Sequence, residues 1–210
     1  MPRKTLVFTA SLLIAFNLSA CAESNTTGIS EAATNGPNPV YTGKVPDFTG
    51  PYASQFTTAY QNTSSDLARQ ILQDEQITES EFAEAQAALG KCLESQGYSD
   101  IAFFPDGGFS LTAPDGLSEA AGEKIMKECD ASSGIGEVEP IYTSILVNPN
   151  NEDWDQLNVD CLIREGVVEP GFTKEDLDQW YANEDPRLGN GGEADKCTTD
   201  PLGLLDGSVQ

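Results

Sequence analysis

Four cysteines, spread from the middle of the chain to its end, are the residues with the clearest chemistry. They are Cys92, Cys129, Cys161 and Cys197. An even number of cysteines in an exported chain indicates disulfides, and four cysteines allow three pairings. Cys92 precedes Cys129 by 37 positions and Cys161 precedes Cys197 by 36, so these pairs would close two loops of nearly equal length. We therefore predict the disulfides Cys92–Cys129 and Cys161–Cys197.

A fifth cysteine, Cys21, follows a segment with the features of an export signal. Arg3 and Lys4 precede an apolar run over residues 6–16. This run is too short to span a bilayer, which needs about 20 residues, and is typical of a secretory leader. The last four residues, Leu18, Ser19, Ala20 and Cys21, resemble the lipobox of bacterial lipoproteins. That resemblance implies cleavage before Cys21 and acylation of its thiol. The alternative is an ordinary signal peptide with a coincidental cysteine.

These signals predict how the chain is organised. Residues 1–20 form the lipoprotein signal peptide, and residues 21–50 form the lipidated cysteine and a flexible tether rich in Ser, Asn, Thr, Gly and Pro. Residues 51–200 are long enough for a single extracellular domain held by disulfides, and residues 201–210 form a tail. We expect the protein at the outer side of the cell membrane, attached through two or more acyl chains, because one chain anchors only marginally.

The charge balance excludes one class of partner and favours another. The chain has 34 acidic residues and 11 basic ones, two of which leave with the leader, so the mature chain has a formal net charge of −25. Such a surface repels nucleic acid and attracts basic proteins. We expect an envelope or transporter protein with a basic face as partner. The chain also has no histidine, the commonest general base and zinc ligand.

Apolar periodicity predicts a mainly α fold with one small β-hairpin, an α+β arrangement. Residues 101–104 and 109–112 flank a Gly-containing turn and read as the two strands. About six helices are expected, and residues 62–65, which interrupt the good helix formers of the first, could break it. The expected helix starts are Pro51, Thr78, Leu117, Pro140, Glu152 and Thr173, with Thr78 and Glu81 forming a capping box.

Two expected helix ends share the pattern Cys-Leu-x3-Gly, at residues 92–97 and 161–166. Each begins with a cysteine whose proposed partner lies about 36 residues later. One interpretation is that the domain contains two similar halves. The other is coincidence, because glycine is the common residue at helix ends.

No residue set predicts a reaction or a cofactor. Acids at 152–155 and 175–176 could offer oxygens to a weak calcium site, but they also lie in first helical turns, where acids are favoured. Two carboxylates could hydrolyse a glycosidic bond, although no pair can be identified among 34 acids. Trp154, Trp180 and Tyr181 could line a groove, but their helical spacing favours the core. The catalytic residues are unknown, and no metal or cofactor is expected.

The chain resembles a group of uncharacterised secreted lipoproteins of high-GC Gram-positive bacteria. The matching features are the lipobox, the tether, the Ile-Thr-x-x-Glu-aromatic helix start at 77–82, the Cys-Leu-x3-Gly helix end, and Asn148-Pro149-Asn150. The resemblance implies a location and no activity. We therefore expect a membrane-anchored extracytoplasmic lipoprotein that acts as a binding or accessory protein of the cell envelope. The alternatives are a hydrolase using acids alone and a protein that only occupies the wall.

Overall fold

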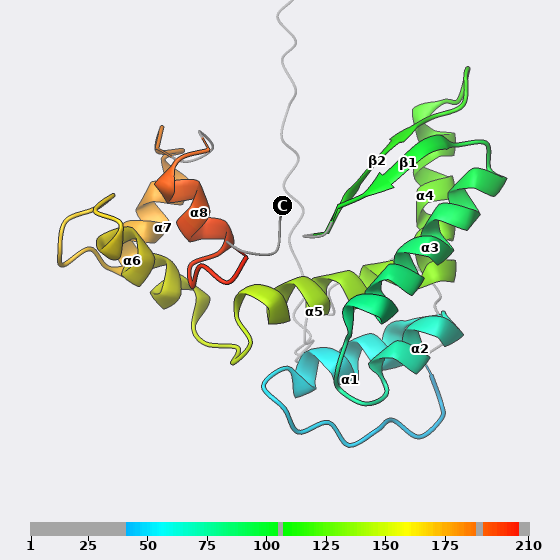
Figure 1. Cartoon of the computed structure of the whole chain (residues 1–210), viewed down its shortest axis with the longest axis horizontal. Coiled ribbons are helices and arrows are strands. Elements are labelled where there is room, and N and C mark those ends of the chain that lie inside the picture. Colours follow the sequence, from blue (N-terminus) through cyan, green and yellow to red (C-terminus); the bar gives the residue numbers. More distant parts are fainter. Residues whose placement is uncertain (1–40, 105–106, 188–190, 206–210) are drawn as a thin grey trace, which may run out of the picture. The chain divides into compact units, whose positions relative to one another are not determined.

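The computed structural model describes residues 41–104, 107–187 and 191–205 (Figure 1). The expected leader, Cys21 and most of the tether lie outside these residues. The elements in chain order are α1 (Ala53–Asn62), α2 (Asp66–Leu72), α3 (Glu79–Ser95), β1 (Ser99–Phe103), β2 (Phe109–Thr112), α4 (Glu119–Ser133), α5 (Ile135–Val147), α6 (Trp154–Arg164), α7 (Lys174–Ala182) and α8 (Glu193–Thr199). Within the described ranges, no helix combines the length and the apolar character needed to cross a membrane.

The mainly helical fold with one antiparallel hairpin and two disulfides is confirmed, but the expected number of six helices is wrong. The described residues contain eight helices. One extra helix arises because the first expected helix is split into α1 and α2. The other is α8, which buries only Ala194 and Cys197. Two buried residues in a helix of seven are too few to show a helical periodicity in the sequence.

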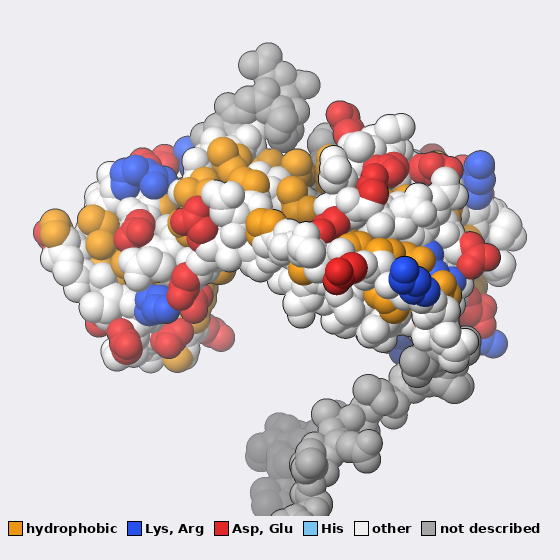
Figure 2. Space-filling model, turned by 90° about the horizontal axis from the view of Figure 1, so that it is seen from below, with side chains coloured by type: hydrophobic (Ala, Val, Ile, Leu, Met, Phe, Trp, Pro, Cys, Tyr) orange, Lys and Arg blue, Asp and Glu red, His pale blue; other side chains and the backbone are white. Residues whose placement is uncertain are grey.

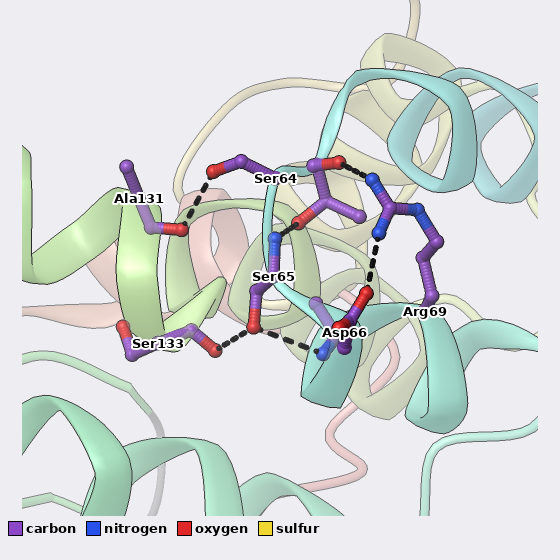
Figure 3. A network of polar contacts seen from close by, with 8 residues as sticks. Ser64, Ser65, Asp66, Arg69, Ala131 and Ser133 are labelled. Atoms are coloured by element: carbon purple, nitrogen blue, oxygen red, sulfur yellow. Dashed lines mark hydrogen bonds and ion pairs between the residues drawn. The ribbon is translucent and has the colours of Figure 1, made fainter. Parts of the chain in front are cut away.

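The break between α1 and α2 is fixed by polar contacts with the end of α4 (Figure 3). Thr63 is fully buried, and its hydroxyl accepts a hydrogen bond from the Ser65 backbone N–H. The Ser65 hydroxyl caps α2 and donates to the Ser133 carbonyl, while Ser64 donates to the Ala131 carbonyl. Arg69 donates to the Thr63 carbonyl and to Asp66. The Ser65 N–H and the Thr63 carbonyl, which a continuous helix would pair within its own backbone, are thus paired with side chains.

The hairpin forms where the sequence predicts it. In β1 and β2, Phe103 pairs with Phe109 and Ala102 with Ser110. Two isolated strands are marginally stable, so their apolar side chains need a support. Phe103, Phe109 and Leu111 pack against the main hydrophobic core, and Figure 1 shows the hairpin beside α3 and α4.

The expected start of a helix at Pro140 is wrong, because α5 begins five residues earlier and contains Pro140 in its interior. Gly134 ends α4 with φ 75° and is directly followed by α5. A Cβ at Gly134 would lie 2.4 Å from the Cβ of Ala68. Glycine is therefore required both for the close approach of this residue to α2 and for its positive φ. The free energy gained by burying Ile135 and Val138 outweighs the cost of the backbone hydrogen bond that Pro140 cannot donate.

The described hydrophobic side chains form two separate clusters. The first contains sixteen buried residues from α1–α5 and Tyr98, including Phe56, Leu72, Leu93 and Val138. The second contains seven, from α6, α7 and α8, and two of these are Cys161 and Cys197. Residues 41–50, expected within the flexible tether, instead contact the first cluster through Phe48, whose ring packs on Phe56 and Tyr60.

Both predicted disulfides are present. Cys92 and Cys129 join α3 to α4 with a Cα–Cα distance of 5.4 Å, and Cys161 and Cys197 join α6 to α8 with a Cα–Cα distance of 5.5 Å. Each bridge therefore closes its loop within one hydrophobic cluster.

The two Cys-Leu-x3-Gly segments end their helices in the same way. The Gly97 and Tyr98 N–H groups donate to the Glu94 and Leu93 carbonyls of α3. At the end of α6, the corresponding bonds run from Gly166 to Ile163 and from Val167 to Leu162. Both sets form a Schellman motif, with glycine at positive φ. The elements that follow differ, because α3 leads into the hairpin and α6 leads into a loop and α7.

Candidate functional site

A pocket of about 630 Å³ lies at the C-terminal end of α5. It is lined by Tyr52, Gln55, Pro140, Ile141, Thr143, Ser144, Leu146, Val147, Asn148, Asn151, Glu152, Trp154, Thr199 and Leu205. Half of these residues have aliphatic or aromatic side chains, and the other half carry hydroxyl, amide or carboxylate groups. This size and lining are typical of sites that bind small ligands.

Helix α5 supplies one wall because its final turns are apolar on more than one side. Ile141 and Tyr142 are buried in the first cluster. Leu146 and Val147 are half-buried and line the pocket, and Leu146 also packs against the first cluster. A helix that is apolar beyond the face needed for the core leaves hydrophobic surface that a ligand can cover.

Tyr52 ties the start of α1 to the end of α5. Its hydroxyl donates to the Asn148 carbonyl at 2.7 Å and lies 3.1 Å from the Ser144 carbonyl. Burial raises the pKa of the Tyr52 hydroxyl, so this group stays protonated and keeps its role as a donor. The Asn148 carbonyl accepts this hydrogen bond at the end of α5, where carbonyl groups lack partners within the helix.

The loop over residues 148–152 is held by side-chain to backbone hydrogen bonds. The buried Asn148 amide donates to the Glu152 carbonyl and its oxygen accepts from the Glu152 N–H, both at 2.9 Å. Asn151, at φ 51°, donates to the Pro51 carbonyl at 2.7 Å. The Asn148-Pro149-Asn150 motif thus has a structural role, which is to shape one edge of the pocket.

The charge around the pocket is negative. Glu152 is exposed at the pocket, and its carboxylate accepts a hydrogen bond from the Asn150 amide. None of the lining residues is a lysine or arginine. Lys174, at the start of α7, lies 2.8 Å from Asp153, and this contact lowers the pKa of the Asp153 carboxyl and raises that of the Lys174 amine.

Figure 2 shows one face of the molecule, on which hydrophobic side chains gather among scattered acidic groups. Four large hydrophobic residues are more than a third exposed among the described residues. They are Phe104, Tyr181, Leu202 and Leu204. Leu204 precedes Leu205, which lines the pocket.

The three aromatic residues singled out in the sequence have different positions. Trp154 is half-buried and lines the pocket. Trp180 lies in the second cluster, as its spacing predicts, with Phe172 against its ring and the Arg187 guanidinium 4.0 Å from the ring centroid. Tyr181 is 46% exposed.

The acids considered for calcium act at helix starts. Asp153 caps α6 by accepting from the Gln156 N–H, and Asp176 forms a capping box with Thr173 at the start of α7. Among the residues that the structure describes, no group of three or more acidic or cysteine side chains could hold a metal ion. These positions therefore have the capping role that the sequence also allowed.

A smaller hollow of about 360 Å³ contains two carboxylates, Asp130 and Glu139, among apolar side chains from α3, α4, α5 and β2. Burial raises the pKa of the Asp130 carboxyl, which accepts a hydrogen bond from the Gly136 N–H. Glu139 accepts from the Gly108 N–H at 2.8 Å and so ties the hairpin turn to α5. Both carboxylates thus hold neighbouring elements together, which favours a structural role over catalysis by acids alone.

Sequence reasoning found the disulfides and missed the pocket. The lining residues come from three segments, 52–55, 140–154 and 199–205, and none of these carries a recognisable motif for binding. The available signals were the apolar end of α5, at residues 145–147, and Trp154, which was considered for a groove. Comparisons with protein-family models, curated proteins and solved structures found no match.

Proposed function

We propose that this chain is a lipid-anchored extracytoplasmic binding protein whose ligand occupies the pocket at the end of α5. The observation that carries the proposal is the pocket of about 630 Å³, whose wall combines apolar side chains with polar groups. This combination favours a binding protein over one that only occupies the cell wall, because passive display requires no pocket.

The wall of the pocket is held in place before any ligand binds. Tyr52 joins α1 to the end of α5, and the Asn148 side chain closes the adjoining loop. Little conformational entropy is therefore lost in ordering these groups when a ligand binds, which favours affinity. Burying apolar surface supplies about 25 cal/mol per Å² before the costs of association are subtracted.

The location rests on the leader. Arg3 and Lys4, the apolar run and the four residues ending at Cys21 support export followed by acylation of the Cys21 thiol. The resemblance to secreted lipoproteins of high-GC Gram-positive bacteria supports the same location. Replacing Cys21 with alanine should move the protein from the membrane fraction to the medium. Retention of the C21A protein in the membrane would contradict the lipid anchor.

The pocket is tested with Nile red, a neutral apolar dye, and the full-length C21A chain purified from the medium. We expect saturable binding of one dye per chain, weakened at least about tenfold by Val147→Lys. Lysine is tolerated in the last turn of a helix but would place a charge in the apolar wall. The matched control is Phe104→Lys, at a 45% exposed side chain on the hairpin. Equal losses in both variants, or no saturable binding, would contradict the proposal.

A protein partner with a basic face is proposed alongside the ligand. The 34 acidic residues against 11 basic ones support electrostatic steering toward such a partner. We expect a pull-down from intact membranes to recover an envelope or transporter protein at low salt and to lose it at high salt, because exposed charges are screened. Recovery of no salt-sensitive partner would contradict this part of the proposal.

A further inference from the structure

We infer that the ligand of this pocket is a small cationic amphiphile, an apolar group that carries one positive charge. The inference rests on the proposed function, because it names the class of ligand that the same pocket would take. It is carried by the charges around the pocket, by the orientation of α5 and by the apolar lining.

The ionisable groups that lie at the pocket and beside it favour a cation. Glu152 is the one charged residue among those that line the described pocket. Asp153 and Asp155 follow it, and only Asp153 is paired with a cation, Lys174. A ligand with a positive group would meet an exposed carboxylate here, whereas a ligand carboxylate would meet like charge.

Helix α5 adds to this preference because its C-terminus ends at the pocket. Ser144, Leu146 and Val147, all in the last turn, line the hollow. A helix C-terminus carries a partial negative charge from carbonyl groups that have no partner within the helix, and this charge favours a nearby cation. Two of the carbonyls at this end, those of Ser144 and Asn148, already accept the Tyr52 hydroxyl, which fixes the helix end at the pocket wall.

The rest of the lining selects the apolar part of the ligand. Ile141, Leu146, Val147, Trp154 and Leu205 supply aliphatic and aromatic surface. The volume of about 630 Å³ lies within the range that encloses most of a small ligand. An alkyl or aryl group would be buried against this surface while its charged end stays beside Glu152.

The inference is tested with three probes that share a ten-carbon chain and differ in their polar end. These are decyltrimethylammonium, 1-decanol and decanoate, titrated below their aggregation limits. The protein is the full-length C21A chain that also carries Trp180→Phe, so that Trp154 in the pocket is the reporting fluorophore. We expect decyltrimethylammonium to bind at least about tenfold more tightly than decanoate, with 1-decanol between them.

Two variants place the preference at the pocket. Glu152→Gln should reduce the ratio of decyltrimethylammonium to decanoate affinity at least about threefold. Glu84→Gln, at an exposed site on α3 outside the pocket, makes the same change in net charge and should leave the ratio unchanged. Equal or tighter binding of decanoate would overturn the inference while leaving the apolar pocket in place. No change of Trp154 fluorescence with any probe would overturn both the inference and the proposed function.

Discussion

The two disulfide-bonded regions use the same local sequence in very different cores. Each has a helix ending in Cys-Leu-x3-Gly, with the same Schellman motif and with a buried leucine, Leu93 or Leu162, that is 0% exposed. The loops that the bridges close differ by one residue, 37 against 36. Yet among the described residues, the hydrophobic cluster of α1–α5 contains sixteen buried residues and the cluster of α6–α8 contains seven.

This difference indicates which region depends on its covalent bond. In the chain-entropy model, loops of 36 and 37 residues give nearly equal stabilisation, about 4 kcal/mol each. A small cluster of apolar side chains contributes little folding free energy, so small regions commonly need a disulfide or metal. Two of the seven buried residues in the second region are the bridged cysteines themselves. We therefore expect the two disulfides to contribute nearly equal stabilisation. Removing Cys161–Cys197 should nevertheless have the larger effect, because the region of α6–α8 has the smaller hydrophobic cluster.

The largest effect is expected from removing the Cys161–Cys197 bridge. The double variant C161A/C197A should unfold α6–α8 locally while α1–α5 remain folded. Hydrogen exchange resolved by residue would show loss of protection confined to residues 154–199. Removal of Cys92–Cys129 is the matched comparison, and there the region of α1–α5 should stay folded with a lower melting temperature. Equal loss of protection in the two variants would contradict the difference between the cores.

A smaller effect is expected from the glycines that end α3 and α6. Gly97 and Gly166 have φ values of 90° and 68°, which alanine adopts only with strain. Gly97→Ala and Gly166→Ala should each cost about 1 kcal/mol of local stability. Urea unfolding followed by exchange should show that the same cost reduces protection more in the second region, because less stability is available there. A loss of stability smaller than experimental error in both variants would show that the shared motif is not needed to stabilise either region.

The smallest effect concerns pH, to which we expect the two regions to respond in opposite directions. In the first region, burial raises the pKa of the carboxyls of Asp130 and Glu137. Their protonated forms favour the folded state, so this contribution is present below about pH 4 and is lost as the pH rises through the raised values. The variants Asp130→Asn and Glu137→Gln should therefore slightly stabilise this region at pH 7, by less than about 1 kcal/mol.

In the second region the carboxyl pKa values move down. Hydrogen bonds from Arg187 lower the pKa of Asp185 to about 2, and Lys174 lowers that of Asp153. This stabilisation is present above about pH 4 and is lost as the pH falls through the lowered values. Exchange measured at pH 7 and pH 3 should show protection falling in α6–α8 relative to α3–α5. The reverse order would contradict these assignments.

Local features of the fold could be predicted because each rests on residues close together in sequence. The capping box of Thr78 and Glu81 and the antiparallel pairing of β1 with β2 are both present as expected. The disulfide pairing also followed from spacing. Pro140 misled the prediction of α5 because the cost of an internal proline is local, whereas burial of Ile135 and Val138 depends on tertiary packing.

The pocket could not be predicted for the same reason. Tyr52 and Asn148 are 96 positions apart, and only the fold shows that a hydrogen bond joins them. The helical spacing of Trp154 favoured the core, whereas the residue is half-buried and lines the pocket. Asn148-Pro149-Asn150 was recognisable as a motif, but its role in shaping the loop depends on contacts with Glu152 that the sequence does not display.

The most direct test is the position of bound decyltrimethylammonium on the full-length C21A chain, mapped by amide chemical-shift changes in NMR spectra. We expect the largest changes at the start of α1, the end of α5 and residues 148–154, which together line the pocket. The same titration in Val147→Lys should lose these changes. Shifts centred on the hairpin around Phe104 or on Trp180, with the residues of the pocket unaffected, would contradict the assignment of this pocket as the ligand site.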